Sequence, residues 1–140
     1  MGWVGFGFLV VGLLDFVLVW LPPDAGNPEW RFSSAAQGFG ALPIPTLGLV
    51  LLLVAAFHVR RRWWALLSGG AALVLGLGVL VSVALWVPSV PLALETVPEE
   101  LKAGLYRTLA QMTMQSLAYP GLFAYLAWMG IRYGPAISSR

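Results

Sequence analysis

Four long runs of apolar residues alternate with short polar links along the chain. The runs cover residues 2–21, 41–59, 63–87 and 112–131, and each has the length of about 20 residues that a membrane-spanning helix needs. Asp15 is the one charged residue within them. The pattern predicts an all-α integral membrane protein, a four-helix bundle that forms a single domain over residues 1–140.

The composition agrees with a bilayer as the surrounding solvent. Apolar residues make up 59% of the chain and charged residues 10%, with a mean hydropathy of +0.83. A soluble domain has about 25% charged residues. The net charge is +2, and the positively charged residues lie beside the apolar runs. We therefore interpret these residues as signals of membrane topology and expect no nucleic-acid partner. Cysteine is absent, which excludes disulfides and thiolate metal sites.

The arginines predict an orientation. Arg60, Arg61 and Arg62 fill the link between the second and third runs, and Arg132 and Arg140 follow the fourth. The other two links, 22–40 and 88–111, hold the acidic residues Asp24, Glu29, Glu95, Glu99 and Glu100. Lys and Arg concentrate on the cytoplasmic side of membrane proteins. We therefore expect a multi-pass protein of the bacterial inner (plasma) membrane with both termini and the arginine anchor in the cytoplasm.

The two outward links carry their own local signals. Prolines stiffen residues 22–28, and aromatic residues recur among small and polar ones from Glu29 to Gly40, which predicts a short helix on the membrane surface. This segment acts either as a lid on the bundle or as a recognition loop for a partner or glycan. Its candidate contact residues are Asp24, Asn27, Trp30, Arg31 and Phe32. Thr96-Val97-Pro98-Glu99 matches a capping box, which predicts that helix four begins near residue 97.

Polar residues inside the fourth run form one candidate site. Arg107, Gln111, Gln115 and Tyr119 recur every four residues and so share one helix face. Asp15 lies at a comparable depth in the first run. Because polar groups in lipid are costly, we expect Asp15 to face Gln111 or Gln115 inside the bundle. Such a cluster is either a hydrogen-bonded clamp between helices or a site that handles a proton or ligand.

The remaining candidates point to packing and anchoring. Gly69, Ala72 and Gly76 form a small-residue face that allows close helix approach. His58 is the single histidine and has no neighbouring carboxylate, so we interpret it as an interfacial residue. There is no Ser-His-Asp set, no paired carboxylates on one face and no phosphate-binding glycine loop. We expect no enzymatic activity, no cofactor and no metal site.

The string GLLDFVLVWLPPDAGNPEWRF…PIPTLGLVLLL, at residues 12–54, resembles the HpsJ-like membrane proteins of cyanobacteria, which are associated with hormogonium polysaccharide secretion. The shared features are an Asp in the first span, a Pro-Pro turn, an Asn-Pro-x-Trp element and a Pro-x-Pro-x-Leu-Gly-Leu entry into the second span. The matching positions are Asp15, Pro22, Pro23, Asn27, Pro28, Trp30, Pro43, Pro45, Leu47, Gly48 and Leu49. The chain departs at Ala41-Leu42, where a Glu-Arg pair is expected. The resemblance implies polysaccharide secretion as the setting. It also implies that residues 21–32 fix the turn between the first two spans and have a structural, non-catalytic role.

Three functions fit these observations. The first is an accessory or assembly subunit of a larger inner-membrane complex, with polysaccharide export as the setting that the resemblance implies; its partner is another membrane protein. The second is a small homo-oligomeric transporter or channel, in which Asp15, Gln111 and Gln115 line a path. The third is a subunit of an energy-transducing or photosynthetic complex, in which His58 has a role.

Overall fold

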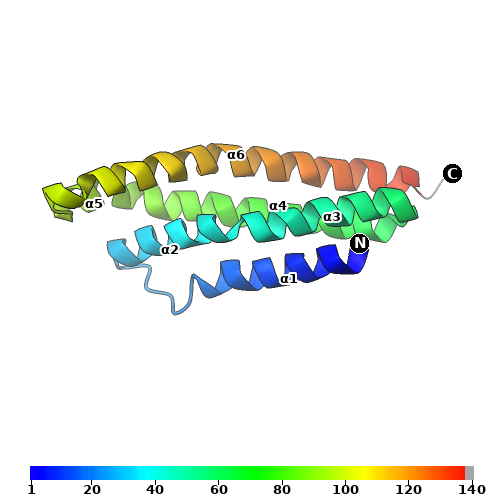
Figure 1. Ribbon diagram of the computed structural model, residues 1–140, viewed down its shortest axis with the longest axis horizontal. Coiled ribbons are helices and arrows are strands. Elements are labelled where there is room, and N and C mark those ends of the chain that lie inside the picture. Colours follow the sequence, from blue (N-terminus) through cyan, green and yellow to red (C-terminus); the bar gives the residue numbers. More distant parts are fainter. Residues whose placement is uncertain (138–140) are drawn as a thin grey trace.

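The computed structural model describes residues 1–137; helices and short links make up this part of the chain, and no strand occurs in it (Figure 1). This confirms the predicted all-α class. The elements are α1 (Gly2–Leu18), α2 (Pro28–Ala41), α3 (Pro43–Val59), α4 (Arg62–Trp86), the 3₁₀ turn η1 (Val87–Ser89), α5 (Val90–Thr96) and α6 (Glu99–Ile137).

Several of these elements join end to end into long helices. Leu42 alone separates α2 from α3, and the continuous helix Pro28–Val59 has 32 residues; η1 and α5 extend α4 into a helix Arg62–Thr96 of 35 residues. At about 1.5 Å per residue, these helices are roughly 48 and 52 Å long. In the described part of the chain, these two are long and apolar enough to cross a membrane by length and composition. α1 is apolar but shorter, with 17 residues.

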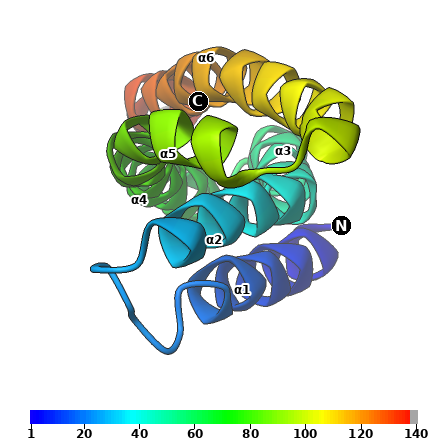
Figure 2. The same cartoon turned by 90° about the vertical axis from the view of Figure 1, so that its left-hand side faces the viewer.

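The helices lie along one long axis, with α1 and α6 on opposite sides (Figures 1 and 2). α1 packs on α3, α3 packs on α4, and α4 packs on α6, while α2 contacts α4 and α1. The N-terminus, the α3–α4 link and the end of α6 lie together at one end (Figure 1). The beginnings of α2 and α6 lie with α5 at the other end, which we call the acidic end because Glu29, Glu95, Glu99 and Glu100 are exposed there.

The predicted short helix over residues 29–40 forms as α2, but it continues into the next helix and is not a separate element of an outer loop. The non-helical link ends at Asn27, whose side-chain Oδ1 accepts a hydrogen bond from the Glu29 N–H at 3.0 Å and so caps α2. α2 then continues into α3 instead of lying across it. Pro43 does not end the helix, because it occupies the first turn of α3, where a missing N–H costs little. The helix also continues through Leu42, whose carbonyl accepts from the Thr46 N–H at 3.1 Å.

The second outer loop, 88–111, is also largely helical, since η1, α5 and the first turns of α6 occupy it. The predicted capping box is not formed. The Thr96 hydroxyl donates to the Leu92 carbonyl at 2.9 Å, within α5, and α6 begins at Glu99. Thr96 is the last residue of the preceding helix, so it is not placed to cap the following one.

Glycines bring two helix pairs unusually close. A Cβ added at Gly12 of α1 would lie 2.3 Å from the Pro45 Cδ of α3, and one added at Gly130 of α6 would lie 2.5 Å from the Ala65 carbonyl oxygen of α4. Both distances are far below van der Waals contact. The α1–α3 and α4–α6 interfaces therefore depend on missing side chains, as close helix packing in membranes commonly does. Phe39, Leu49, Leu75 and Phe123 fill the core beside them.

Candidate functional site

The structure does not bring the predicted polar cluster together. Asp15 is exposed on α1, which packs on α3 and α2, whereas the polar stripe lies on α6, which packs mainly on α4. On that stripe Arg107 and Gln111 are exposed, and Gln115 and Tyr119 are partly buried. The α2–α3 helix and α4 lie between the two sides (Figure 2). The expectation that Asp15 faces Gln111 or Gln115 is therefore wrong for the single chain.

Asp15 instead points away from the chain. Its neighbours one helical turn away, Val11 and Leu18, are 52% and 58% exposed, and Leu14 beside it is 57% exposed. No hydrogen bond or ion pair joins the Asp15 carboxyl to another group in the part of the chain that the structure describes. The outer face of α1 is therefore an apolar surface with one carboxyl group in it. We call this surface, formed by Val11, Leu14, Asp15 and Leu18, the Asp15 face.

The arginine anchor makes the α3–α4 link. Only Arg60 and Arg61 lie between the two helices, and Arg62 begins α4; all three are exposed. Arg60 has φ 53°, the left-handed conformation that commonly ends a helix. His58 is exposed nearby, and the described residues contain no group of three or more side chains suited to hold a metal. Arg140 lies outside the described residues.

Aromatic side chains gather at the same end. Trp3 packs edge-on against Trp64, with ring centroids 5.4 Å apart, and the Arg132 guanidinium lies 5.1 Å from the centre of the Trp128 ring. Trp63 is exposed beside them. This end, which we call the basic end, therefore combines cations with amphipathic rings.

The predicted small-residue face lies against α6. A Cβ added at Gly69 would lie 3.3 Å from the Ala127 carbonyl oxygen and 3.3 Å from the Gly130 Cα. Ala72 is fully buried, and a Cβ on Gly76 would lie 3.5 Å from the Phe123 Cβ. These residues position α6, and Ala72 and Gly76 also line a small hollow of about 150 Å³ between α4 and α6.

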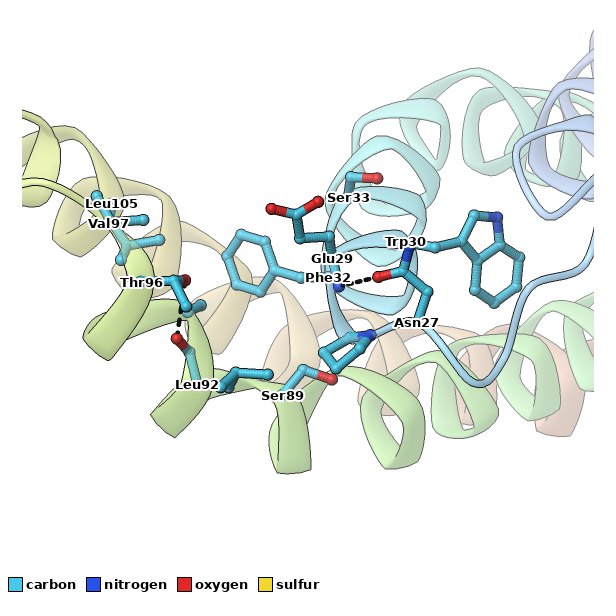
Figure 3. Close-up of a pocket in the computed structure, with 12 residues that line it drawn as sticks. Asn27, Glu29, Trp30, Phe32, Ser33, Ser89, Leu92, Thr96, Val97 and Leu105 are labelled. Carbon is cyan, nitrogen blue, oxygen red and sulfur yellow. Dashed lines mark hydrogen bonds between the residues drawn. The ribbon is translucent and has the colours of Figure 1, made fainter.

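The predicted outer-loop residues divide between three tasks. Asp24 is exposed in the link, and Asn27 caps α2. Trp30 packs edge-on against Trp20, two residues after the end of α1, with ring centroids 5.6 Å apart, so it ties α2 to the end of α1. The Arg31 Nε is buried without a hydrogen-bond partner among the described residues. Only Phe32 points into open space between helices (Figure 3).

That space is a cavity of about 660 Å³ at the acidic end (Figure 3). One wall comes from α2 and the other from η1, α5 and the start of α6. The lining residues are Asn27, Pro28, Glu29, Trp30, Phe32, Ser33, Ser89, Leu92, Ala93, Thr96, Val97 and Leu105. Carbon dominates the lining, and Glu29 is its one charged residue. We call this the α2–α5 cavity.

Sequence patterns do not indicate this cavity: they predict a short surface helix over one wall, residues 29–40, but no helix over residues 88–96 and no contact between the two segments. Signals for the helices are present, such as Asn27-Pro28 as a cap followed by proline at the first helical position. Nothing in the sequence indicates that α2 and α5 lie opposite each other. Comparisons with protein-family models, curated proteins and solved structures gave no match for this chain.

Proposed function

We propose that this chain is a non-enzymatic, four-span inner-membrane protein that acts as an accessory or assembly subunit of a larger membrane complex. The spans are α1, the α2–α3 helix, α4 and α6, arranged as a four-helix bundle. Exposed apolar side chains on every span support insertion, among them Val17, Val54, Leu77 and Leu117, which are 49–77% exposed. In water such a surface would be strongly unfavourable.

The spacing of aromatic residues supports the same placement. Tyr106 and Trp128 of α6 are exposed and 22 residues apart, which is about 33 Å along a helix. Tyr and Trp favour the two membrane interfaces, and the hydrocarbon core is about 30 Å thick. A bilayer centred between these residues leaves α5 and the first turn of α6 outside the hydrocarbon. The basic end then faces the cytoplasm by the positive-inside rule.

The observation that carries the subunit function is the Asp15 face. Asp15 precedes Trp20 by five residues, so it lies about 7.5 Å inside the interfacial ring. An Asp at the centre of a span costs roughly 2.5–3.5 kcal/mol and less towards the interface, and charged residues within spans almost always face protein or a water-filled path. Because this chain supplies no partner group among its described residues, we assign the partner to a second membrane protein with a Lys, Arg or amide donor at that depth. The setting of polysaccharide export rests on the sequence resemblance alone.

Co-purification from native membranes tests the proposal. We expect the wild-type chain, extracted in mild detergent, to appear in native mass spectrometry with another polypeptide at fixed stoichiometry. Asp15→Leu should reduce recovery of that polypeptide at least roughly tenfold, because removing one member of a buried ion pair costs about 3–5 kcal/mol. Asp24→Leu, a matched change in the exposed link, should leave recovery unchanged.

The test also separates the alternatives. A pure homo-oligomer that Asp15→Leu dissociates would replace the hetero-subunit function with self-assembly, as the transporter hypothesis requires. Equal recovery of the partner with Asp15→Leu and Asp24→Leu would refute the role of the Asp15 face. A transport path through Asp15, Gln111 and Gln115 of one chain is not supported, because these residues lie on opposite sides of the molecule.

A further inference from the structure

We propose that the α2–α5 cavity binds one amphiphile, whose apolar chain enters the cavity and whose head group donates hydrogen bonds through amino or hydroxyl groups. A volume of about 660 Å³ lies within the range of small-molecule pockets, about 300–1,000 Å³. Phe32 projects from α2 towards Thr96 and Leu92 of α5 without filling the gap between them (Figure 3). An unfilled apolar cavity of this size gains free energy when an apolar group displaces its water.

The apolar walls define where the chain of the amphiphile lies. Phe32 and Leu92 form opposite sides, and Val97 and Leu105 close the end towards α6 (Figure 3). Trp30 contributes little, because its ring turns away to pack on Trp20. The cavity therefore offers a continuous aliphatic and aromatic surface between two helices, which suits a flexible hydrocarbon chain.

The polar groups of the lining define the head group. Ser89 and Thr96 already donate their hydroxyl protons to the carbonyls of Leu85 and Leu92, at 3.2 and 2.9 Å, so they offer only acceptor lone pairs. Glu29 is exposed at the rim and has no ion-pair partner among the described residues. Asn27 and Ser33 add a side-chain amide and a hydroxyl, so the rim offers donors as well as acceptors, and Glu29 gives it a negative charge. An ammonium or hydroxyl head group complements it, whereas a sulfate or phosphate is repelled.

The cavity lies close to the outward-facing interface of the inner membrane. This placement rests on the proposed membrane insertion. Leu105 directly precedes Tyr106, which marks that interface. The mouth is then at the height of the lipid head groups, where amphiphiles concentrate. Binding itself is a property of the isolated chain and does not depend on the Asp15 face.

The experiment uses three octyl probes below their micelle concentrations: octylammonium, octyl glucoside and octyl sulfate. Each is titrated into the full chain held in amphipol, and binding is followed by isothermal titration calorimetry. We expect saturable binding of one octylammonium or one octyl glucoside per chain, and binding of octyl sulfate at least roughly tenfold weaker because of Glu29. Glu29→Gln should weaken octylammonium binding and bring the sulfate closer to the glucoside.

Two filling variants locate the site. Leu92→Trp and Val97→Phe should each abolish octyl glucoside binding, because a larger side chain occupies the apolar space. Leu117→Trp, at a position that is 77% exposed on α6 and outside the cavity, is the matched control and should bind as the wild type does. Absence of saturable binding, equal binding of the three head groups, or unchanged binding by both filling variants would each overturn the proposal. None of these outcomes alters the co-purification that tests the Asp15 face.

Discussion

Gly130→Ala tests whether α4 and α6 touch through their backbones. The added Cβ would lie 2.5 Å from the Ala65 carbonyl oxygen and 2.8 Å from the Gly69 Cα and N atoms. Ordinary contacts begin near 3.4 Å, so the Cβ overlaps the Ala65 oxygen by about 0.9 Å. All three neighbours are backbone atoms, which cannot rotate away. The two helices must therefore separate.

The cost follows from that separation. A gap of about 0.5–1 Å forfeits a quarter to a half of each dispersion contact, and overpacking of this kind costs about 1–3 kcal/mol. Replacing glycine by alanine within a helix returns about 1 kcal/mol. We expect Gly130→Ala to lower the free energy of unfolding by about 1 kcal/mol in total.

The matched control is Gly121→Ala, on the same helix. A Cβ there meets nothing within 4 Å, so only the gain in helix propensity remains, about 1 kcal/mol. The assay is unfolding in mixed micelles followed by circular dichroism. The free energies of unfolding of the two variants should differ by about 2 kcal/mol: Gly130→Ala should be less stable than the wild type and Gly121→Ala more stable. Equal stabilities would refute the close approach of α4 and α6.

Three further changes give distinct results in the same unfolding assay. Ser68→Ala removes the buried hydroxyl that donates to the Leu49 carbonyl at 3.1 Å and so joins α4 to α3; we expect a loss of about 1 kcal/mol, and an unchanged stability would contradict that link. Arg60→Gly relieves the left-handed backbone at the end of α3 and should stabilise the protein by about 1 kcal/mol, whereas a loss would show that the arginine side chain matters more than its backbone. Asn27→Ala removes the cap that accepts from the Glu29 N–H and should cost about 1 kcal/mol, which Asn27→Asp restores; a stable Asn27→Ala variant would indicate that α2 does not begin there.

Apolar run length is enough to predict the long helices, but it gives the wrong boundaries at the acidic end. Pro43 and Pro45 suggest the beginning of a span, although they lie within a continuous helix that begins at Pro28. Proline is unfavourable in the interior of a helix but is well suited to its first turn. That holds both for a helix that follows a loop and for one that stacks directly on a preceding helix. The sequence alone does not distinguish these two arrangements.

The predicted polar cluster is wrong for a different reason. Spacing by four defines the face that Gln111 and Gln115 share on one helix, but it does not identify the helix opposite. Packing decides that, through the contact of Gly12 with Pro45 and of Gly130 with Ala65. Gly12 places α1 against α3, and Asp15 is consequently left on the outside. The α2–α5 cavity is beyond prediction because it depends on how two segments pack against each other, which the periodicity of neither segment indicates.

Single-cysteine labelling in intact cells tests whether the chain spans the membrane with its acidic end outward, the topology on which the proposed function rests. The sequence has no cysteine, so each introduced thiol reports alone. A membrane-impermeant maleimide should label Asp24→Cys and Glu100→Cys from outside, and should label Val59→Cys, at the basic end, only after permeabilisation. Labelling of Val59→Cys in intact cells, or protection of the other two, would contradict this topology.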